Sequence, residues 1–334
     1  MLFLKSKSIF LVATALTVNA AVTQYPAKPL VDAINSQFGP FIEGTAVDDE
    51  GNIFAVNHGN SARVGTIGQV TPQELFYEDK TAKGTAFNGI RFFVKDDKTF
   101  AYAADYINHR VVELTINDDD ITSKNFCASP DMIQPNDLAL SRAGLLFLSG
   151  TKWKPNNQAG DGDLWVCSPA GVPQRLETLG RTNGIELSPD DKYLYLSEAA
   201  NRNGAPVSNK IWRYDVNPAT GAVSNKKVFF DFLKIQTQHI DIDGMRTDIK
   251  GNLFVTRNGG SEVLKMSPNG DILASIKTTF TFPSNIEFGG PNGTTLYIVG
   301  RCGINTPHGH GVGCVDTWEN DAPGRAWWIL QDNE

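Results

Sequence analysis

The sequence lacks any apolar run that is long enough to cross a bilayer. Its longest such stretch, IFLVATALTV at residues 9–18, is about half of the roughly 20 residues that a membrane-spanning helix needs. Lys5 and Lys7 precede this stretch and Val18-Asn19-Ala20 resembles a small-residue cleavage site, an order that is typical of a secretory signal peptide. We therefore expect residues 1–20 to be a signal peptide rather than a buried N-terminal strand, and the mature protein to be secreted.

The sequence is also short of positive charge. It carries 30 lysines and arginines against 37 aspartates and glutamates, which gives a formal net charge of −7. It has no long charge run and no low-complexity tract. An acidic protein is a poor candidate for binding nucleic acid or an anionic membrane, so we expect neither as a partner.

Several catalytic signatures are missing. The sequence has no G-x-S-x-G motif, and none of its five histidines has the context of a hydrolase triad, so a serine nucleophile is disfavoured. It has no phosphate loop or dinucleotide fingerprint, because its glycine-rich segment at residues 258–270 lies between expected strands and not before a helix. Any catalytic chemistry must therefore come from another arrangement of residues.

Cysteine is scarce, with four residues and no C-x-x-C pair. Four cysteines fit an oxidising destination and allow three connectivities. We prefer the pairing of Cys302 with Cys314, which flank a short loop, and of Cys127 with Cys167. Asn292 begins an Asn-Gly-Thr sequon and is therefore a candidate glycosylation site.

What the sequence does contain is a six-fold repeat. Each copy starts with Asn, Asp or Glu, continues with alternating apolar and polar residues, turns, and enters a second β-rich stretch, which is a hairpin pattern. The six copies begin at Glu43, Asn88, Asn136, Asn183, Asp243 and Asn285. A further candidate strand follows each copy, and the first positions lie 42 to 60 residues apart, which suits four-stranded propeller blades.

These repeats predict an all-β fold, a six-bladed β-propeller with four-stranded blades. No linker interrupts the series, so we expect residues 21–334 to form a single domain and not two β domains in tandem. The N-terminal segment AVTQYPAKPLV at residues 21–31 could complete the last blade and close the ring.

The first residue of each repeat is expected at the rim of a central channel, which the innermost strands of a propeller line. An Asn-Gly pair such as Asn183-Gly184 usually forms a hairpin turn. Here, however, the hairpin turns at residues 189–191, and the equivalent positions of two other repeats hold Glu43 and Asp243. The shared property is a side-chain oxygen. Two carboxylates and four carboxamides favour a hard divalent cation, Ca²⁺ before Mg²⁺ or Mn²⁺, with Zn²⁺ as the least favoured substitute.

Three segments carry a resemblance to a known family. They are TNGIELSPDDKYLYLSEA at residues 182–199, DGMRTDIKGNLFVTRNGGSEVLKMSPNGDIL at 243–273 and FPSNIEFGGPNGTTLYIVG at 282–300. With most of residues 40–303, they resemble the SMP-30/gluconolactonase/LRE-like family of calcium-dependent six-bladed propeller lactonases, in the form of a secreted fungal-type member. The resemblance implies metal ligands at Glu43, Asn136, Asn183 and Asp243.

The same resemblance bears on the substrate. Asn88 and Asn285 are further rim amides, which we interpret either as groups that hydrogen-bond to the metal ligands or as substrate contacts. Gln134, another candidate contact, stands where the animal gluconolactonases have an arginine that contacts sugar hydroxyls, so the substrate need not be a sugar lactone.

The expected chemistry is hydrolysis assisted by the cation, which can polarise a lactone carbonyl and lower the pKa of a bound water. Asp243 is the best candidate for the nucleophile or the base. His58, at the end of a second strand, is a further candidate base or substrate donor.

Three long loops are expected above the site because they follow second strands, which return toward the rim. They are Lys152–Gly162, Ala200–Ser208 and Arg301–Val312. We expect Trp153, Arg301 and His308 in these loops to contact the substrate, with Cys302 and Cys314 bracing the last loop.

The sequence therefore predicts a monomeric, Ca²⁺-dependent hydrolase of a small-molecule lactone. Hydrolysis of another ester, including an organophosphate ester, is the alternative within enzymes. A non-catalytic, Ca²⁺-stabilised propeller that binds a ligand is the alternative outside enzymes. The acidic pair Glu43 and Asp243 favours an enzyme, since a scaffold needs no carboxylates at the channel rim.

Overall fold

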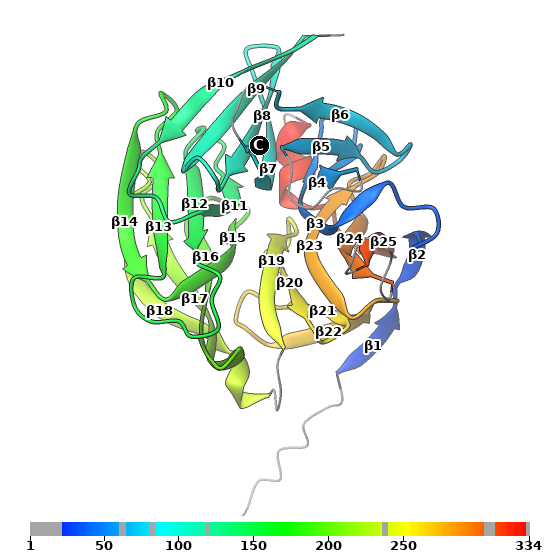
Figure 1. Ribbon diagram of the computed structural model, residues 1–334. Coiled ribbons are helices and arrows are strands. Elements are labelled where there is room, and N and C mark those ends of the chain that lie inside the picture. Colours follow the sequence, from blue (N-terminus) through cyan, green and yellow to red (C-terminus); the bar gives the residue numbers. More distant parts are fainter. Residues whose placement is uncertain are drawn as a thin grey trace, which may run out of the picture.

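The computed structural model describes residues 22–59, 65–80, 84–117, 120–235, 240–303 and 311–331. In these residues six sheets surround a common axis (Figure 1). Each sheet contains a four-stranded antiparallel blade, so the predicted six-bladed, all-β propeller is confirmed. No helix among these residues is long and apolar enough to cross a membrane.

The first three strands of each blade run in chain order from the axis outward. The inner strands, which neighbour one another around the ring, are β3 (Phe38–Val47), β7 (Phe87–Lys95), β11 (Pro135–Leu140), β15 (Arg181–Leu187), β19 (Asp241–Thr247) and β23 (Phe282–Gly289). The second strands are β4 (Ile53–His58), β8 (Lys98–Asp105), β12 (Leu146–Thr151), β16 (Tyr193–Arg202), β20 (Leu253–Asn258) and β24 (Thr295–Cys302). The third strands are β5 (Thr66–Gln69), β9 (Arg110–Asn117), β13 (Gly162–Cys167), β17 (Ala205–Val216), β21 (Glu262–Met266) and β25 (Val312–Glu319).

The outermost strands close the ring. Five of them follow their own blades, namely β6 (Glu74–Glu78), β10 (Asp120–Ala128), β14 (Pro173–Leu179), β18 (Val223–Asp231) and β22 (Ile272–Lys277). The sixth is the N-terminal β2 (Lys28–Val31), which pairs antiparallel with β25, as the sequence suggested. The preceding β1 (Thr23–Pro26) adds a parallel fifth strand to β22, an addition that the sequence did not indicate (Figure 1).

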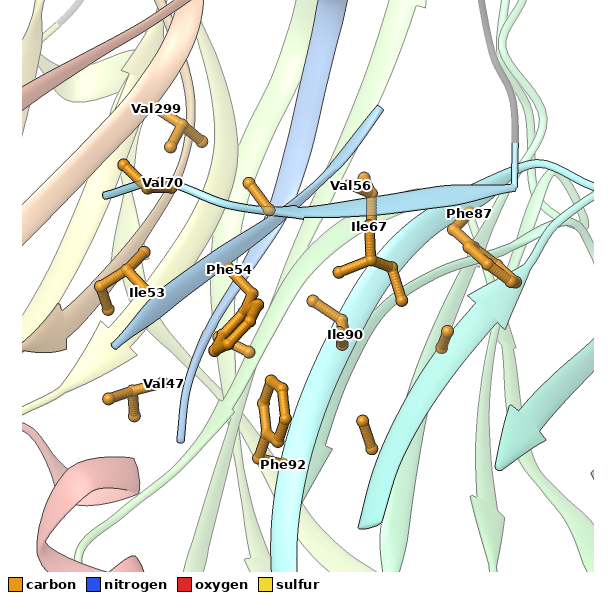
Figure 2. Close-up of a cluster of buried hydrophobic side chains, with 14 of the residues drawn as sticks. Val47, Ile53, Phe54, Val56, Ile67, Val70, Phe87, Ile90, Phe92 and Val299 are labelled. Atoms are coloured by element: carbon orange, nitrogen blue, oxygen red, sulfur yellow. The ribbon is translucent and has the colours of Figure 1, made fainter. Parts of the chain in front are cut away.

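Burial follows this radial order. All six residues of β11 are buried, whereas β10 is mostly exposed, because inner strands lie between neighbouring blades and outer strands face solvent. Apolar side chains fill the space between blades. Phe54 of β4 and Phe92 of β7 pack with ring centroids 4.9 Å apart, next to Ile67 and Ile90 (Figure 2). Burial of each such side chain contributes about 1.5–3 kcal/mol.

Every inner strand is irregular at the first position of its repeat. Its pairing with the second strand shifts at or beside Glu43, Asn88, Asn136, Asn183, Asp243 and Asn285. A β-bulge breaks the regular alternation and re-aims a side chain. The six polar residues thus occupy the positions at which each inner strand departs from the regular pleat.

Gly184 explains the Asn-Gly pair of the fourth repeat. It lies inside β15 and not in a turn, and a Cβ on it would overlap the backbone carbonyl oxygen of Asp243 in the next blade. Gly89 has the same relation to the carbonyl oxygen of Asn136, which a Cβ would approach to 2.6 Å. Glycine at these positions lets adjacent inner strands approach closely enough to bring their polar residues together.

The segment Ala200–Ser208 corrects one expectation. It is not a long loop over the site, because β16 and β17 stay paired there, with Ala200 opposite Ser208 and Arg202 opposite Ala205. Asn203 and Gly204 both have positive φ, 52° and 80°, as a two-residue hairpin turn requires.

Replacement of Gly184 tests the close approach of the inner strands. We expect Gly184→Ala to lower the free energy of unfolding by about 3 kcal/mol, the upper range for overpacking, because backbone is what the new Cβ meets. Gly204→Ala is the matched control, since its Cβ meets nothing within 4 Å and only its backbone conformation is strained, which costs about 1 kcal/mol. Urea unfolding measures both, and an equal loss in the two variants would contradict the proposed packing.

Candidate functional site

The six polar residues of the inner strands converge at one mouth of the channel. Glu43, Asn88, Asn136 and Asp243 line a cavity of about 200 Å³. The two others are hydrogen-bonded to its acids: Nδ2 of Asn183 donates to Oδ1 of Asp243 at 2.7 Å, and Nδ2 of Asn285 donates to Oε1 of Glu43 at 3.2 Å. The structure therefore brings together all the rim residues that the repeat predicted.

The two acids of this rim interact with each other. Burial raises the pKa of Glu43 well above its usual range, and the nearby charges of Asp243 and Asp137 raise it further. Burial, together with the charge of Asp241, also raises the pKa of Asp243. Two neighbouring carboxylates repel each other when both are ionised. A bound cation would offset this repulsion and favour their ionised forms.

Amides and an ion pair position Asp243. Nδ2 of Asn258, at the end of β20, donates to Oδ2 of Asp243 at 2.9 Å, while Asn183 holds the other oxygen. Two residues earlier on their strands, Arg181 forms an ion pair with Asp241. The guanidinium of Arg181, which is buried, also lies under the ring of Trp153 at 4.9 Å. Both oxygens of Asp243 are thus fixed from neighbouring strands.

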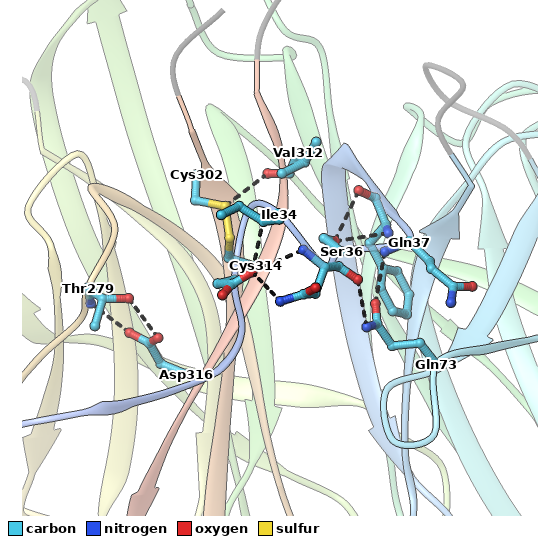
Figure 3. Close-up of a disulfide and its surroundings, with 12 residues drawn as sticks. Ile34, Ser36, Gln37, Gln73, Thr279, Cys302, Val312, Cys314 and Asp316 are labelled. Atoms are coloured by element: carbon cyan, nitrogen blue, oxygen red, sulfur yellow. Dashed lines mark hydrogen bonds between the residues drawn. A yellow bond between two sulfur atoms is a disulfide. The ribbon is translucent and has the colours of Figure 1, made fainter. Parts of the chain in front are cut away.

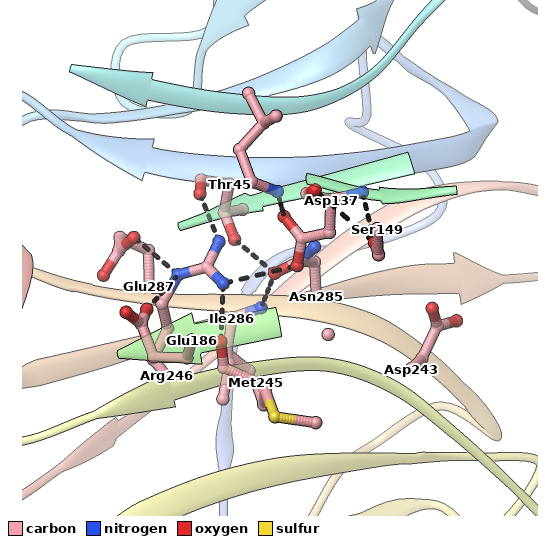
Figure 4. A network of polar contacts seen from close by, with 12 residues as sticks. Thr45, Asp137, Ser149, Glu186, Asp243, Met245, Arg246, Asn285, Ile286 and Glu287 are labelled. Atoms are coloured by element: carbon pink, nitrogen blue, oxygen red, sulfur yellow. Dashed lines mark hydrogen bonds and ion pairs between the residues drawn. The ribbon is translucent and has the colours of Figure 1, made fainter. Parts of the chain in front are cut away.

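A buried ionic network forms the floor beneath the rim (Figure 4). At its centre Arg246 donates to Oε2 of Glu287 at 2.8 Å and to the backbone oxygen of Thr45 at 2.9 Å. Its guanidinium lies 3.5 Å from Asp137 and 3.9 Å from Glu186. These side chains all come from inner strands, one layer below the rim residues.

Further arginines complete this network. Arg91 of β7 forms an ion pair with Asp137 at 3.2 Å. Arg325, at the start of the C-terminal helix α1 (Arg325–Leu330), forms ion pairs with Glu186 at 3.5 Å and with Asp191. The acids of the floor thus have arginine partners, whereas Glu43 and Asp243 at the rim form no ion pair with an arginine of the described residues.

The cavity walls combine amides with apolar side chains. Gln134, Trp153 and Arg301 line the cavity, as expected from the sequence. The lining also contains residues that sequence reasoning missed, namely Pro40, Phe41, Ile42, Asn57, Tyr106, Pro135, Asn258, Phe282 and Ser284. The asparagines in VNH and TRN, near the ends of second strands, were the signal that could have revealed Asn57 and Asn258.

The structure does not bring His58 to the cavity. Its ring packs edge-on against Phe38, with centroids 5.2 Å apart, and lies beside Gly68 of β5. Asn57 lines the cavity instead, with φ of 66°. The position of His58 thus gives no support to its expected role as a base. His308 lies outside the residues that the structure describes.

Two disulfides join the cysteines in the preferred pairing. Cys127 is bonded to Cys167, which links blades 2 and 3. Cys302 is bonded to Cys314 across the paired strands β24 and β25 (Figure 3). The second disulfide lies directly after Arg301 and so restrains one wall of the cavity. Asn292 is exposed in the turn between β23 and β24, and its glycosylation stays a prediction.

The donor chemistry of the rim fits a hard divalent cation. Glu43, Asn136, Asn183 and Asp243 offer carboxylate and carboxamide oxygens, the ligands that Ca²⁺ prefers. The described residues contain no group of three or more His, Cys, Asp or Glu side chains that could hold a metal, so a cation at the rim would depend on the carboxamide oxygens as well as on the two acids.

The ionic floor should dominate the stability of the ring. Replacement of Arg246 by methionine leaves the buried Glu287 without an arginine partner, while Asp137 and Glu186 keep only Arg91 and Arg325, and we expect this to lower the free energy of unfolding by about 3–5 kcal/mol. Lys250→Met removes an exposed ion pair with Asp321 and should cost less than about 1 kcal/mol. Urea titrations compare the two, and a cost below about 1 kcal/mol for Arg246→Met would contradict a central role for this network.

Comparisons with known proteins agree with this architecture. The chain matches the SMP-30/Gluconolactonase/LRE-like region over residues 79–300. A gluconolactonase of Zymomonas mobilis subsp. mobilis is 30% identical over 179 residues, which cover 49% of this chain and 47% of that protein. The chain spans about half the length of the curated relatives it matches.

Solved structures share the fold. A luciferin-regenerating enzyme superposes with a TM-score of 0.67 at 17% identity and covers 89% of this chain and 97% of its own. A calcium-binding protein, regucalcin from Agrobacterium tumefaciens strain C58, gives a TM-score of 0.65 at 16% identity and covers 90% of this chain and 98% of its own. With the match over residues 79–300, the chain belongs to the SMP-30/gluconolactonase/LRE-like family.

Proposed function

We propose that the protein is a secreted, divalent-cation-dependent lactonase that opens the ring of a small-molecule lactone, with Ca²⁺ as its resident ion. The family and the gluconolactonase relative support a lactone as the substrate class. The observation that carries the proposal is the pair of neighbouring acids, Glu43 and Asp243, in a cavity whose other rim residues are neutral amides. Neither acid forms an ion pair with a cation among the described residues within 4.0 Å.

Each group at the rim has a separate task in this proposal. When bound by Glu43, Asn136, Asn183 and Asp243, the cation would polarise the lactone carbonyl and lower the pKa of a bound water. In one route Asp243 accepts the proton of the water that attacks the carbonyl carbon, the ring C–O bond breaks, and the ring oxygen takes up a proton to give the hydroxy acid. In the other route Asp243 attacks the carbonyl carbon itself, the same C–O bond breaks, and water then hydrolyses the acyl-enzyme to release the hydroxy acid and restore Asp243. Asn258 and Asn183 hold its two oxygens in place, which keeps the carboxylate aimed at the reacting carbon.

The remaining lining residues bind and orient the substrate. Asn88 and Gln134 offer hydrogen bonds to a carbonyl or hydroxyl group, and apolar side chains such as Phe41 and Phe282 cover the carbon skeleton. Below the cavity lie Arg246 and its acidic partners, all of which are buried.

The proposed setting is extracellular. Residues 1–20 have the composition of a signal peptide, the two disulfides suit an oxidising compartment, and Asn292 is exposed within a glycosylation sequon. We further propose that the protein acts as a monomer.

Cation binding can be measured without any substrate. We expect Ca²⁺ to stabilise the folded protein, by about 2.7 kcal/mol at one hundred times its dissociation constant, because a ligand of the folded state alone raises stability. Glu43→Gln and Asp243→Asn should each remove most of this gain, whereas Asp131→Asn, which changes an exposed acid, should keep it. Thermal unfolding with and without chelator measures the effect. If Ca²⁺ leaves the midpoint of the wild-type protein unchanged, the proposed ion site is refuted.

Hydrolysis is tested on a panel of lactones and esters, including an organophosphate ester, by acid release in the presence and absence of chelator. Wild-type protein should release acid from at least one lactone only while the cation is present. Asp243→Asn should lower kcat at least about 100-fold, the usual contribution of a positioned base, while its circular dichroism stays native. Asp131→Asn is again the control. Turnover of esters alone would favour the wider esterase, and no chelator-sensitive turnover at all would favour a binding protein.

A further inference from the structure

One charged side chain of the cavity has no task in the proposed hydrolysis. Among the residues that line the cavity, the acids are Glu43 and Asp243 and the single base is Arg301. Arg301 is half-buried near the end of β24, and no acidic side chain within the described residues lies close enough to form an ion pair with it. The other arginines near the channel, Arg181 and Arg246 among them, do have acidic partners.

The guanidinium of Arg301 is held in place by an aromatic ring. Its central carbon lies 4.4 Å from the ring centroid of Phe282, the residue directly opposite on β23. Stacking on a ring restrains a guanidinium while leaving the N–H groups at its edge available for a planar anion. Such an arrangement lowers the entropy cost of binding a carboxylate through two parallel hydrogen bonds.

The backbone of Arg301 is restrained as well. It pairs with Phe282 on one side and with Gly313 of β25 on the other. The next residue, Cys302, is linked to Cys314 by a disulfide (Figure 3). Gly311 lies so close that a Cβ on it would come within 3.3 Å of Cγ of Arg301. Arg301 is therefore a fixed feature of the wall and not a flexible surface side chain.

Charge balance decides what Arg301 can bind. A divalent cation held by Glu43 and Asp243 makes the rim formally neutral, and Arg301 then leaves the cavity with one uncompensated positive charge. Arg301 is half-buried beside the partly exposed Phe282, so a neutral lactone that covers the guanidinium would remove its water without replacing the hydrogen bonds, which is unfavourable. A ligand with one negative charge restores neutrality.

We propose that the cavity selects lactones whose ring carries a carboxylate, and that Arg301 binds this carboxylate. The inference rests on the proposed function for its reaction, because the lactone ester is still the bond that is hydrolysed. It adds the substrate class. Arg301 belongs to blade 6, between the blades of Glu43 and Asp243, so the carboxylate lies toward blade 6 while the ester group faces the rim.

Two matched lactones test the selection. 5-Oxotetrahydrofuran-2-carboxylate and its carboxamide share one lactone ring and differ by a single charge. We expect wild-type protein with Ca²⁺ to hydrolyse the carboxylate with at least about a tenfold higher kcat/KM, the fold-change expected of a charge-assisted hydrogen bond. Arg301→Gln should reduce this ratio to near one, and Arg301→Lys should keep part of it because the charge remains. Arg175→Gln is the matched control, since Arg175 also stacks on a ring, that of Trp165, but on an outer strand.

Binding of unreactive analogues separates this inference from the proposed function. Tetrahydrofuran-2-carboxylate and tetrahydrofuran-2-carboxamide have no ester to hydrolyse, and calorimetry with the wild-type, Arg301→Gln and Arg175→Gln proteins compares their affinities. If neither lactone is hydrolysed but the carboxylate binds in an Arg301-dependent way, the proposed function fails and the selection stands. Equal affinities for the two analogues, no binding of either, or a preference that survives Arg301→Gln would overturn the selection.

Discussion

The guanidinium of Arg246 is the interaction on which the centre of this molecule depends. It is 1% exposed, it donates to the backbone oxygen of Thr45 on β3, and it compensates acids from three other inner strands. A closed ring of six strands leaves a polar channel that cannot be filled by apolar side chains alone, and a buried charge there must be paired. The arginines of the floor pair with Asp137, Glu186 and Glu287. The rim acids Glu43 and Asp243 have carboxamides and not arginines as their partners among the described residues. The fold thus separates a floor, in which acids are paired with arginines, from a rim, in which the acids lack such partners among the described residues and offer oxygen ligands to the proposed cation.

The rim owes its geometry to two departures from ideal strand structure. Bulges at the first position of each repeat take side chains such as Asn183 and Asp243 out of the regular pleat. Glycines such as Gly184 then allow the neighbouring strand to approach, so that residues 60 positions apart in sequence meet within hydrogen-bond distance. Both the bulge and the glycine are needed for the contact between Asn183 and Asp243, because a side chain turned out of the pleat reaches its partner only when the neighbouring strand is close. Site and fold therefore rest on the same residues.

The features that recur in every repeat could be predicted from the sequence, whereas local departures from the repeat could not. Blade number and the six rim positions followed from a polar residue that begins each hairpin, because period and alternation are visible in sequence. The sequence places His58 at the end of a second strand and so predicts that it faces the site. The positive φ of Asn57 interrupts the alternation of side chains along β4, and a shift of one residue exchanges the two faces of a strand. NRNGAPVS was assigned to a loop by its composition, whereas Asn203-Gly204 is the hairpin turn that Asn183-Gly184 resembled. The apolar and cationic walls of the cavity, including the stacking of Arg301 on Phe282, depend on contacts between strands that no single segment reveals.

The ring is closed by a pairing between the two ends of the chain, with Lys28 opposite Thr317. During synthesis β2 leaves the ribosome long before β25, so β2 lacks its partner strand until β25 has been made. The early blades can assemble from local hairpins, but the last one is a long-range contact that forms slowly. Until then an open edge of β-structure is exposed to other nascent chains. The yield of native protein therefore depends on how that edge is protected during folding, and not only on the strength of the finished core.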